Sequence, residues 1–233
     1  LPPLQPRLVT KLHVSRAVVN DGGVSATPET DPLREAIVRG DLAPNSRLVE
    51  ADLSQAFSMS RGAVRTALVR LEQEGLVTRE RNRGARVRHI GDEEAVEILE
   101  ARAALEGLAA AEAARRIDAK GAKRLAKALE RHTKLLDSGD LLAASDANAA
   151  LHELLLELSG HSTVQQLIRT LKSQTVRFQF RTILVPGRPA TSRKEHAAIV
   201  NAVLEGKPKQ AEKAMRDHLF SVANTLRESV RSG

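Results

Sequence analysis

The chain has 233 residues, and its 36 lysines and arginines against 29 aspartates and glutamates give a net charge of +7. The length suits two modest domains, and the positive charge favours a polyanionic partner. The absence of cysteine excludes disulfides, thiolate metal sites and cysteine nucleophiles, and it suits a reducing cytoplasm, where we expect the protein to act. No apolar run approaches ~20 residues, so no membrane span is expected.

Residues 1–30 are rich in Pro, Gly, Ser and Thr and lack the charged-then-apolar order of a signal peptide, so we expect a flexible N-terminal tail. After the tail, the pattern predicts two domains, residues 31–90 and residues 91–233. The second is rich in alanine and leucine and carries no strand signals, which predicts a mostly α protein.

The first predicted domain begins with a helix that Asp31 caps, that has Pro32 in its first position, and that Gly40 ends. A turn, a short extended run at 47–49 and a brief helix at 50–57 follow. A third helix then starts after Ser60, a good N-cap, and ends before Gly75, a good C-terminal residue for a helix.

The third helix has two distinct faces. One stripe is apolar and should pack against the domain core: Val64, Ala67, Leu68 and Leu71. The other carries Arg65 and Thr66 with Arg61 on its border, beside the small Gly62. Arginines one turn apart near a helix N-terminus can place guanidinium forks on guanine in a major groove. The alternative is an ordinary solvated surface helix.

A basic hairpin follows this helix. Residues 76–80 and 85–89 read as two short strands, joined by a tight loop at 81–84. Between positions 76 and 90 there are five arginines, at 79, 81, 83, 86 and 88, and one acid, Glu80, so the net charge is 5 − 1 = +4. Such a ribbon suits phosphate and groove contacts. Helix, turn, helix and wing together predict a winged helix-turn-helix.

The motifs of residues 31–90 resemble the DNA-binding domain of GntR-family bacterial transcription regulators. The resemblance rests on these segments: Gly40-Asp41-Leu42-Ala43-Pro44, Leu48-Val49-Glu50, Asp52-Leu53, Ser60-Arg61, Val64-Arg65, Ala67-Leu68, Arg70-Leu71-Glu72, Glu74-Gly75-Leu76-Val77 and Asn82-Arg83-Gly84. It implies DNA contacts by Arg47, Ser60, Arg61, Arg65, Thr66, Arg81, Arg83 and Gly84. Gly62-Ala63 replaces the frequent Thr-Pro, so base discrimination should rest on the arginines and Thr66.

The second predicted domain reads as six helices, which favours an antiparallel helical bundle. The expected helices span 92–117, 118–136, 140–158, 162–185, 192–205 and 208–229. Ser162 with Gln165 and Ser192 with Glu195 match capping boxes, and Pro208 suits a first helical position.

Three histidines fall on inward-facing rows of the predicted helices. His152 lies one turn after Asn148, His196 shares a row with apolar residues of its helix, and so does His218. Three imidazoles and an amide oxygen could hold Zn²⁺, Ni²⁺ or Mn²⁺. The alternative is three separate core histidines. His132 is expected to be a packed or partner-facing histidine rather than a ligand.

The second domain resembles the all-helical ligand-sensing domain of the FadR-like branch of GntR regulators. The matching segments are Asn148 to His152, Leu156 to Gly160, Glu195 to Ile199, and Ala211 to Leu219. The resemblance implies a divalent metal, with zinc our first choice, held by Asn148, His152, His196 and His218. Asparagine where the branch often has aspartate removes a negative charge, so the site should bind metal more weakly and depend more on a bound anion.

Three arginines are candidates for effector binding. Arg102 lies on an inward row, where it could face the metal and clamp a carboxylate or pair with Glu106 one turn on. Arg177 and Arg181 could line the same cavity. The effectors usual in the resembled branch are small organic acids.

These features together predict a homodimeric transcription regulator, expected to be a repressor, that binds a palindromic operator and senses a small carboxylate. One rival interpretation is a metal-dependent hydrolase with a DNA-targeting winged helix, although no acid is clearly placed as a general base beside the ligands, since Glu153 and Glu195 fall on other helix faces. Another is a metal-free architectural DNA-binding protein. We expect no enzymatic activity.

Overall fold

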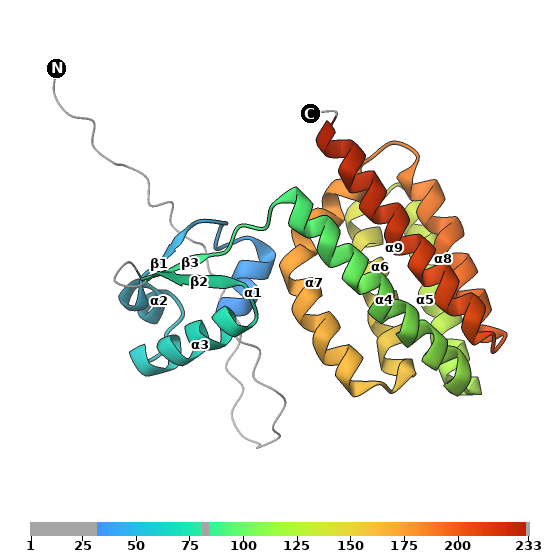
Figure 1. The fold of residues 1–233 in the computed structure, drawn as a ribbon, viewed down its shortest axis with the longest axis horizontal. Helices are drawn as coiled ribbons and strands as arrows, with labels where there is room; N and C mark the ends of the chain where they lie inside the picture. Colours follow the sequence, from blue (N-terminus) through green and yellow to red (C-terminus); the bar gives the residue numbers. More distant parts are fainter. Residues whose placement is uncertain (1–31, 81–83, 232–233) are drawn as a thin grey trace. The chain divides into compact units, whose positions relative to one another are not determined.

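The computed structural model describes residues 32–80 and 84–231, and these residues are largely helical (Figure 1). No helix in these ranges is both long enough and apolar enough to span a bilayer. The N-terminal and C-terminal parts of this structure each have a hydrophobic core of their own.

The described residues of the N-terminal part form three helices and a small sheet. The helices are α1 (Pro32–Arg39), α2 (Glu50–Ala56) and α3 (Arg61–Gln73), and the strands are β1 (Arg47–Leu48), β2 (Val77–Glu80) and β3 (Gly84–Val87). The strands form an antiparallel sheet in the order β1-β3-β2. The hairpin is therefore the predicted wing, and the short extended run before α2 pairs with it as a third strand.

Both ends of α3 follow the sequence signals. The Ser60 side chain accepts a hydrogen bond from the Ala63 amide at 3.1 Å, which satisfies one of the unpaired donors of the first turn. Gly75 has a φ of +69°, the left-handed conformation that ends helices. The predicted apolar stripe is buried, and Val64 and Leu71 are fully inaccessible in a core shared with α1, α2 and the sheet.

The C-terminal part consists of six helices, which run in alternating directions (Figure 1). They are α4 (Asp92–Arg116), α5 (Ala119–Asp137), α6 (Leu141–Ser159), α7 (Ser162–Ile183), α8 (Arg188–Leu204) and α9 (Pro208–Arg231). The core is built from alanine on α4, where backbones approach closely, and from larger side chains such as Leu151, Ile199 and Met215 on the facing helices. The predicted helical bundle is confirmed.

Two predicted capping boxes are wrong. Helix α7 is capped by His161, whose Nδ1 accepts from the Val164 amide at 3.4 Å, so Ser162 is already inside the helix. Helix α8 starts at Arg188, four residues before Ser192, because Gly187 turns the chain at a φ of +82° and proline is favoured in the first turn that follows. Ser192 is consequently buried one turn inside α8. The predicted cap Asp31 lies outside the described residues.

Candidate DNA-binding surface and metal centre

The exposed face of α3 is cationic. Arg61, Arg65 and Thr66 are all exposed, and Gly62 between them has open space around its Cα. Arg65 is oriented by Glu50, which accepts hydrogen bonds from its Nε at 3.2 Å and its Nη2 at 2.9 Å. The helix therefore presents the Arg65 guanidinium and the Thr66 hydroxyl, and Gly62 beside them leaves room for DNA to approach. Base readout in a groove requires these features.

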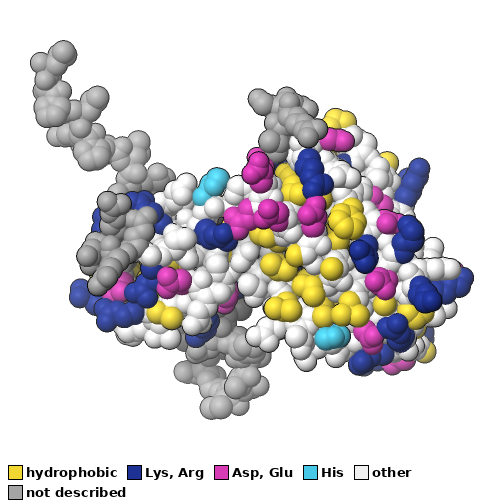
Figure 2. All heavy atoms as spheres, in the orientation of Figure 1, with side chains coloured by type: hydrophobic (Ala, Val, Ile, Leu, Met, Phe, Trp, Pro, Cys, Tyr) yellow, Lys and Arg dark blue, Asp and Glu magenta, His cyan; other side chains and the backbone are white. Residues whose placement is uncertain are grey.

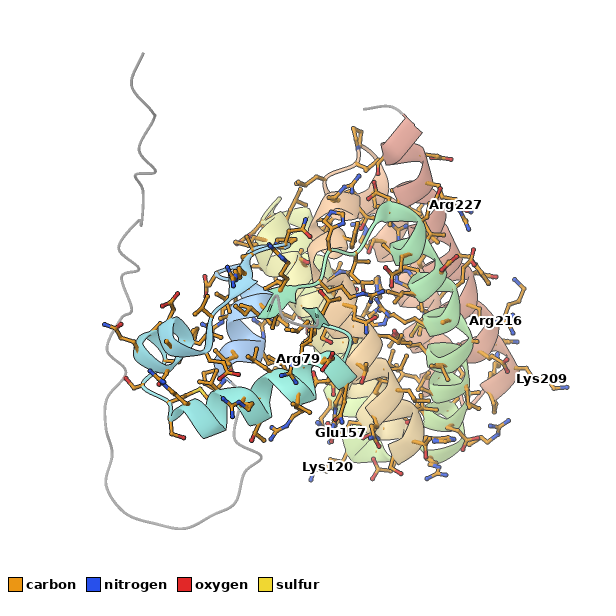
Figure 3. The ribbon with its side chains drawn as sticks, turned by 60° about the vertical axis from the view of Figure 1, so that its left-hand side comes forward. Arg79, Lys120, Glu157, Lys209, Arg216 and Arg227 are labelled. Carbon is orange, nitrogen blue, oxygen red and sulfur yellow. The ribbon has the colours of Figure 1, made fainter. Side chains whose placement is uncertain are left out.

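The sheet carries further basic side chains. Arg47 of β1 lies opposite Arg86 of β3, and both are exposed. Arg79 of β2 is 3.8 Å from Glu72 at the end of α3 (Figure 3). Gly84 opens β3 with a φ of +85°, a conformation that favours glycine. The wing candidates Arg81 and Arg83 lie outside the described residues.

Three buried histidines converge between α6, α8 and α9. His152, His196 and His218 are at most 3 % exposed, and each offers one ring nitrogen in a group whose members lie within 4.8 Å of one another. Their ring centroids are 4.4 to 5.3 Å apart. The helices thus bring together the three imidazoles that the sequence placed on separate inward rows.

The Nδ1 atom of each of these rings, called the outer nitrogen below, lies next to a hydrogen-bond acceptor. Nδ1 of His152 is 2.6 Å from Glu106, and Nδ1 of His218 is 2.7 Å from Glu195. Nδ1 of His196 is 2.7 Å from the Ser192 carbonyl oxygen. Because carboxylate and carbonyl oxygens only accept, all three Nδ1 atoms must carry the proton, which leaves each Nε2 with a free lone pair. This is the arrangement that orients histidine ligands in metal sites.

The Nε2 atoms, the inner nitrogens, are placed so that they could bind one cation together. Nε2 of His152 and Nε2 of His196 are 3.1 Å apart, although neither carries a proton to donate when Nδ1 is protonated. Two lone pairs at this distance repel unless a positive ion lies between them. Two nitrogens bound to one zinc at about 2.05 Å are about 2.9 to 3.3 Å apart for angles between octahedral and tetrahedral. The donor set therefore fits a divalent metal.

The protonation states also suit metal binding. Burial lowers the pKa of His152, burial lowers that of His218 to about 4, and burial with the neighbouring imidazoles holds the pKa of His196 well below its usual value. Burial alone would raise the pKa of Glu106, but Arg102 and His152 hold it well below its usual range. The histidines are consequently neutral at pH 7 beside an ionised carboxylate, as ligation requires.

Two further polar side chains here have atoms without a hydrogen-bond partner in the described part of the chain. Among the described residues, the buried side-chain nitrogen and oxygen atoms without a hydrogen bond are Asn148 Oδ1 and both ring nitrogens of His132. An unpaired buried acceptor is costly, and a cation beside it removes that cost. Asn148 lies one turn before His152 on α6, so its oxygen fits the predicted role of fourth ligand. His132 is packed, as predicted, but its ring centroid is 4.7 Å from that of His196.

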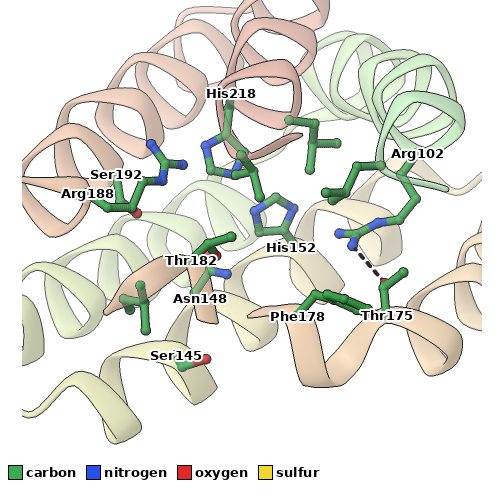
Figure 4. A pocket seen from close by; sticks show the side chains of 14 residues that line it. Arg102, Ser145, Asn148, His152, Thr175, Phe178, Thr182, Arg188, Ser192 and His218 are labelled. Carbon is green, nitrogen blue, oxygen red and sulfur yellow. Dashed lines mark hydrogen bonds between the residues drawn. The ribbon is translucent and has the colours of Figure 1, made fainter. Parts of the chain in front are cut away.

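A small cavity of about 60 Å³, roughly the room of a few water molecules, adjoins the histidines. Arg102 and Arg188 enter it from opposite sides, with His152 and His218 between them (Figure 4). Arg102 Nε donates to Glu106 at 2.8 Å, and its Nη1 is 3.5 Å from Thr175. The predicted Glu106 pairing and the cavity-facing position of Arg102 are therefore both present.

Other predicted positions differ. Arg181 pairs with Asp92 at the surface instead of lining this cavity, because its position on α7 faces solvent. Arg177 lies on α7, but its side chain is not among those described. Glu195 does not line the cavity, but its carboxylate is 2.7 Å from Nδ1 of His218 on α9, a pairing that the sequence did not predict. Both Glu106 and Glu195 bind outer ring nitrogens and do not line the cavity.

Arg188 was missed by the sequence analysis. It is 6 % exposed, its Nη2 is 2.8 Å from Glu195, and its Nη1 donates to Ser221 at 3.3 Å. The predicted start of α8 at Ser192 left Arg188 in a loop, where no helical row could reveal that it faces inward. The signal available in the sequence was the Gly187-Arg188-Pro189 run, which is typical of a helix start.

A winged helix-turn-helix with a cationic third helix, followed by an all-helical domain with a buried cavity, is the architecture of a DNA-binding transcription regulator. The comparisons with known families agree. Residues 30–87 match the bacterial regulatory proteins of the gntR family, and residues 97–221 match the FCD domain. The chain belongs to the GntR family of transcription regulators with an FCD domain, and it is therefore a DNA-binding regulator and not an enzyme.

Two curated relatives span most of the chain. The HTH-type transcriptional repressor GlaR of Escherichia coli is 28% identical over 85% of this chain and 94% of its own length. The HTH-type transcriptional regulator LutR of Bacillus subtilis is 30% identical over 82% of this chain and 95% of its own length.

Solved structures share the fold. The chain matches E. coli McbR/YncC with a TM-score of 0.71 at 18% identity, covering 85% of this chain and 94% of that one. It also matches Lar of Listeria monocytogenes with a TM-score of 0.57 at 20% identity, covering 84% and 93%.

Proposed function

We propose that the protein is a homodimeric repressor that binds a palindromic operator and is released by a small carboxylate bound at a metal site. Asn148, His152, His196 and His218 would hold the metal, with zinc preferred over nickel or manganese because the donors are mainly imidazoles. The ion would supply a fixed positive charge that attracts a carboxylate oxygen. Acting on DNA, the regulator would work in the cytoplasm.

The charge balance around the cavity is the observation that supports an anionic effector. Arg102 is paired with Glu106 and Arg188 with Glu195, so these buried charges cancel. The three histidines are neutral, and Asn148 adds no charge. A divalent ion would therefore bring two uncompensated positive charges into a buried site, where isolated charge is expensive. An anion in the cavity restores neutrality, and the cavity volume limits it to a small one.

The arginines explain how such an anion would be oriented. Each guanidinium has donors beyond those used for its glutamate, and planar forks bind carboxylates in a fixed orientation. Because Arg102 belongs to α4 and Arg188 to α8, an anion between them would connect two helices of the bundle. Ligand binding can shift a conformational equilibrium only through such differential contacts.

Dimerisation is supported by an apolar surface over α4 and α9 (Figure 2). Leu108 is 38 % exposed and Phe220 is 37 % exposed, and Ala101 and Ala104 are exposed on the same stretch of α4. Charged residues border this surface, because the stem of Arg216 on α9 lies over Gly107 of α4 and Lys209 projects outward near the start of α9 (Figure 3). An apolar patch with a charged border suits burial against a second copy, and a palindromic operator needs that two-fold symmetry.

The DNA side rests on the exposed face of α3. Arg61, Arg65 and Thr66 would read base edges, Ser60 would contact the backbone, and Arg47, Arg81, Arg83 and Gly84 would contact the backbone and minor groove. Arg79 and Arg86 add positive charge to the same sheet.

The test is a binding-site selection from random duplex DNA with the zinc-loaded full chain, followed by titration of the selected operator. We expect a palindromic site bound by two chains, and release by at least one member of a panel of carboxylates with two to six carbons. The substitution Phe220→Glu combined with Leu108→Glu should give monomers that bind the operator weakly. A non-palindromic site bound by single chains would contradict the proposal, as would a failure of every acid to alter operator affinity.

A further inference from the structure

His132 is an unusual member of the buried histidine cluster. It lies on α5, 0 % exposed, in a helix that packs on both α6 and α8. Among the described residues, neither of its ring nitrogens has a hydrogen-bond partner, although a neutral imidazole has one donor and one acceptor to satisfy. Burying such a group without partners is costly, so its presence needs an explanation in terms of something that binds it.

The ring has a specific neighbour. Its centroid is 4.7 Å from that of His196, at an interplanar angle of 68°. This separation falls within the 4.4 to 5.3 Å range that relates the three converging histidines to one another. His132 is not a member of the group of three whose nitrogens lie within 4.8 Å of one another, so its ring must reorient to place a nitrogen there.

The other unpartnered atom of the same neighbourhood is Asn148 Oδ1. An asparagine oxygen is a weaker metal ligand than a carboxylate, so a site with Asn148 and three imidazoles lacks one strong donor. Neither ring nitrogen of His132 has a hydrogen-bond partner among the described residues, so the neutral ring has a lone pair that no other group in these residues uses. A buried neutral imidazole with no other partner is the donor that such a site lacks.

We propose that His132 is a fourth imidazole ligand of the metal centre, whose ring turns toward the ion when metal binds. This inference rests on the proposed metal site. It makes the donor set four nitrogens and one amide oxygen, leaving room for one oxygen of the anionic effector in a six-coordinate ion. A nitrogen-rich set of this kind favours zinc, nickel or copper over manganese and magnesium, which prefer oxygen.

The experiment counts imidazoles directly. X-ray absorption of the zinc-loaded full chain should fit four imidazole ligands in the parent and three in His132→Phe, which keeps a planar ring of similar size. Competition with a chelator should show zinc affinity at least about tenfold weaker in the variant, the minimum seen for changes around histidine ligands. The preference for zinc over manganese should fall in parallel. His132→Leu provides a second variant in case the larger ring is not accommodated.

Leu125→Ala is the matched control, because Leu125 is fully buried two turns earlier on the same helix but offers no ligand atom. It should keep four imidazoles and a zinc affinity within about threefold of the parent, below the tenfold range of ligand-shell changes. Three imidazoles in both parent and His132→Phe would overturn the inference, even with weaker zinc binding, since His132 would then only support the site. An equal loss of affinity in Leu125→Ala would assign the effect to packing. A parent that binds no zinc at all would overturn the proposed metal site itself.

Discussion

Glu50 at the start of α2 accepts two hydrogen bonds from one edge of the Arg65 guanidinium on α3, from Nε at 3.2 Å and from Nη2 at 2.9 Å. The hydrogen bond from Arg65 lowers the pKa of Glu50, so the carboxylate stays ionised. A guanidinium has two usable edges, and this pairing leaves the Nη1 side free. The free edge can bind O6 and N7 of guanine while Glu50 fixes the direction of the fork.

Glu50→Ala should therefore reduce DNA specificity without reducing non-specific affinity. The preference for operator over random duplex should fall by about tenfold, because Arg65 loses its fixed orientation. Binding to random DNA should stay equal or strengthen, because a negative charge near the phosphates is removed. Fluorescence titrations with both duplexes at several salt concentrations measure the ratio.

Two variants separate the possible roles of Glu50. Arg65→Ala should lower the same ratio, whereas Arg70→Ala, an exposed arginine one and a half turns further along α3, should change both affinities alike. If Glu50 merely competed with DNA for Arg65, Glu50→Ala would raise operator affinity and leave or increase the ratio. That outcome would remove Glu50 as an orienting residue.

Asn148→Asp should tighten metal binding. The Asn148 oxygen is buried and unpartnered beside the histidines, and a carboxylate there would add a full negative charge next to the cation. We expect zinc affinity to rise on the order of tenfold, and the affinity for an anionic effector to fall, because one uncompensated positive charge is cancelled. Chelator competition and calorimetry with acids that release the parent from DNA would test both. Weaker zinc binding in the variant would exclude Asn148 as a ligand.

The sequence predicted the elements that depend on local signals, such as the Ser60 cap, the stripe from Val64 to Leu71 and the inward rows containing His152, His196 and His218. It could not predict the partners of these histidines. Glu106 reaches His152 from another helix, and Glu195 reaches His218 across the α8–α9 contact, so both pairings depend on how helices pack rather than on spacing. A four-residue error at the start of α8 was sufficient to hide Arg188.

The metal-free protein should lose stability as the pH falls from about 6.5 to about 4. His132 and His218 have pKa values lowered to about 4 by burial, while the unfolded chain protonates them near 6.5. Between these values the unfolded state binds more protons, so the free energy of unfolding decreases with decreasing pH. Each histidine accounts for on the order of 3 kcal/mol across this window.

Denaturant unfolding of chelator-treated protein at pH 7, 5.5 and 4.5 measures this dependence. His132→Leu should be at least as stable as the parent at pH 7 without metal, because an unsatisfied buried polar group is removed, and its stability should fall less steeply toward pH 4.5. An unchanged pH dependence in His132→Leu would mean that His132 does not resist protonation in the folded state.

The last prediction concerns the two arginines that face the cavity. Arg102→Ala should retain operator binding and lose the response to small acids, because the anion loses the donor that joins it to α4. Without a contact that differs between conformations, the acid cannot shift their populations however well the metal holds it. Zinc affinity should fall by less than about tenfold, since Glu106 still accepts the hydrogen bond from His152.

Arg181→Ala is the matched control. Because this arginine pairs with Asp92 at the surface, the variant should keep both operator binding and the response to small acids. Operator titrations of each zinc-loaded protein, with and without an acid that releases the parent, measure how much the acid changes operator affinity. If Arg102→Ala responded to the acid as fully as the parent, Arg102 would serve only to pair with Glu106, and Arg188 would be the arginine that binds the effector.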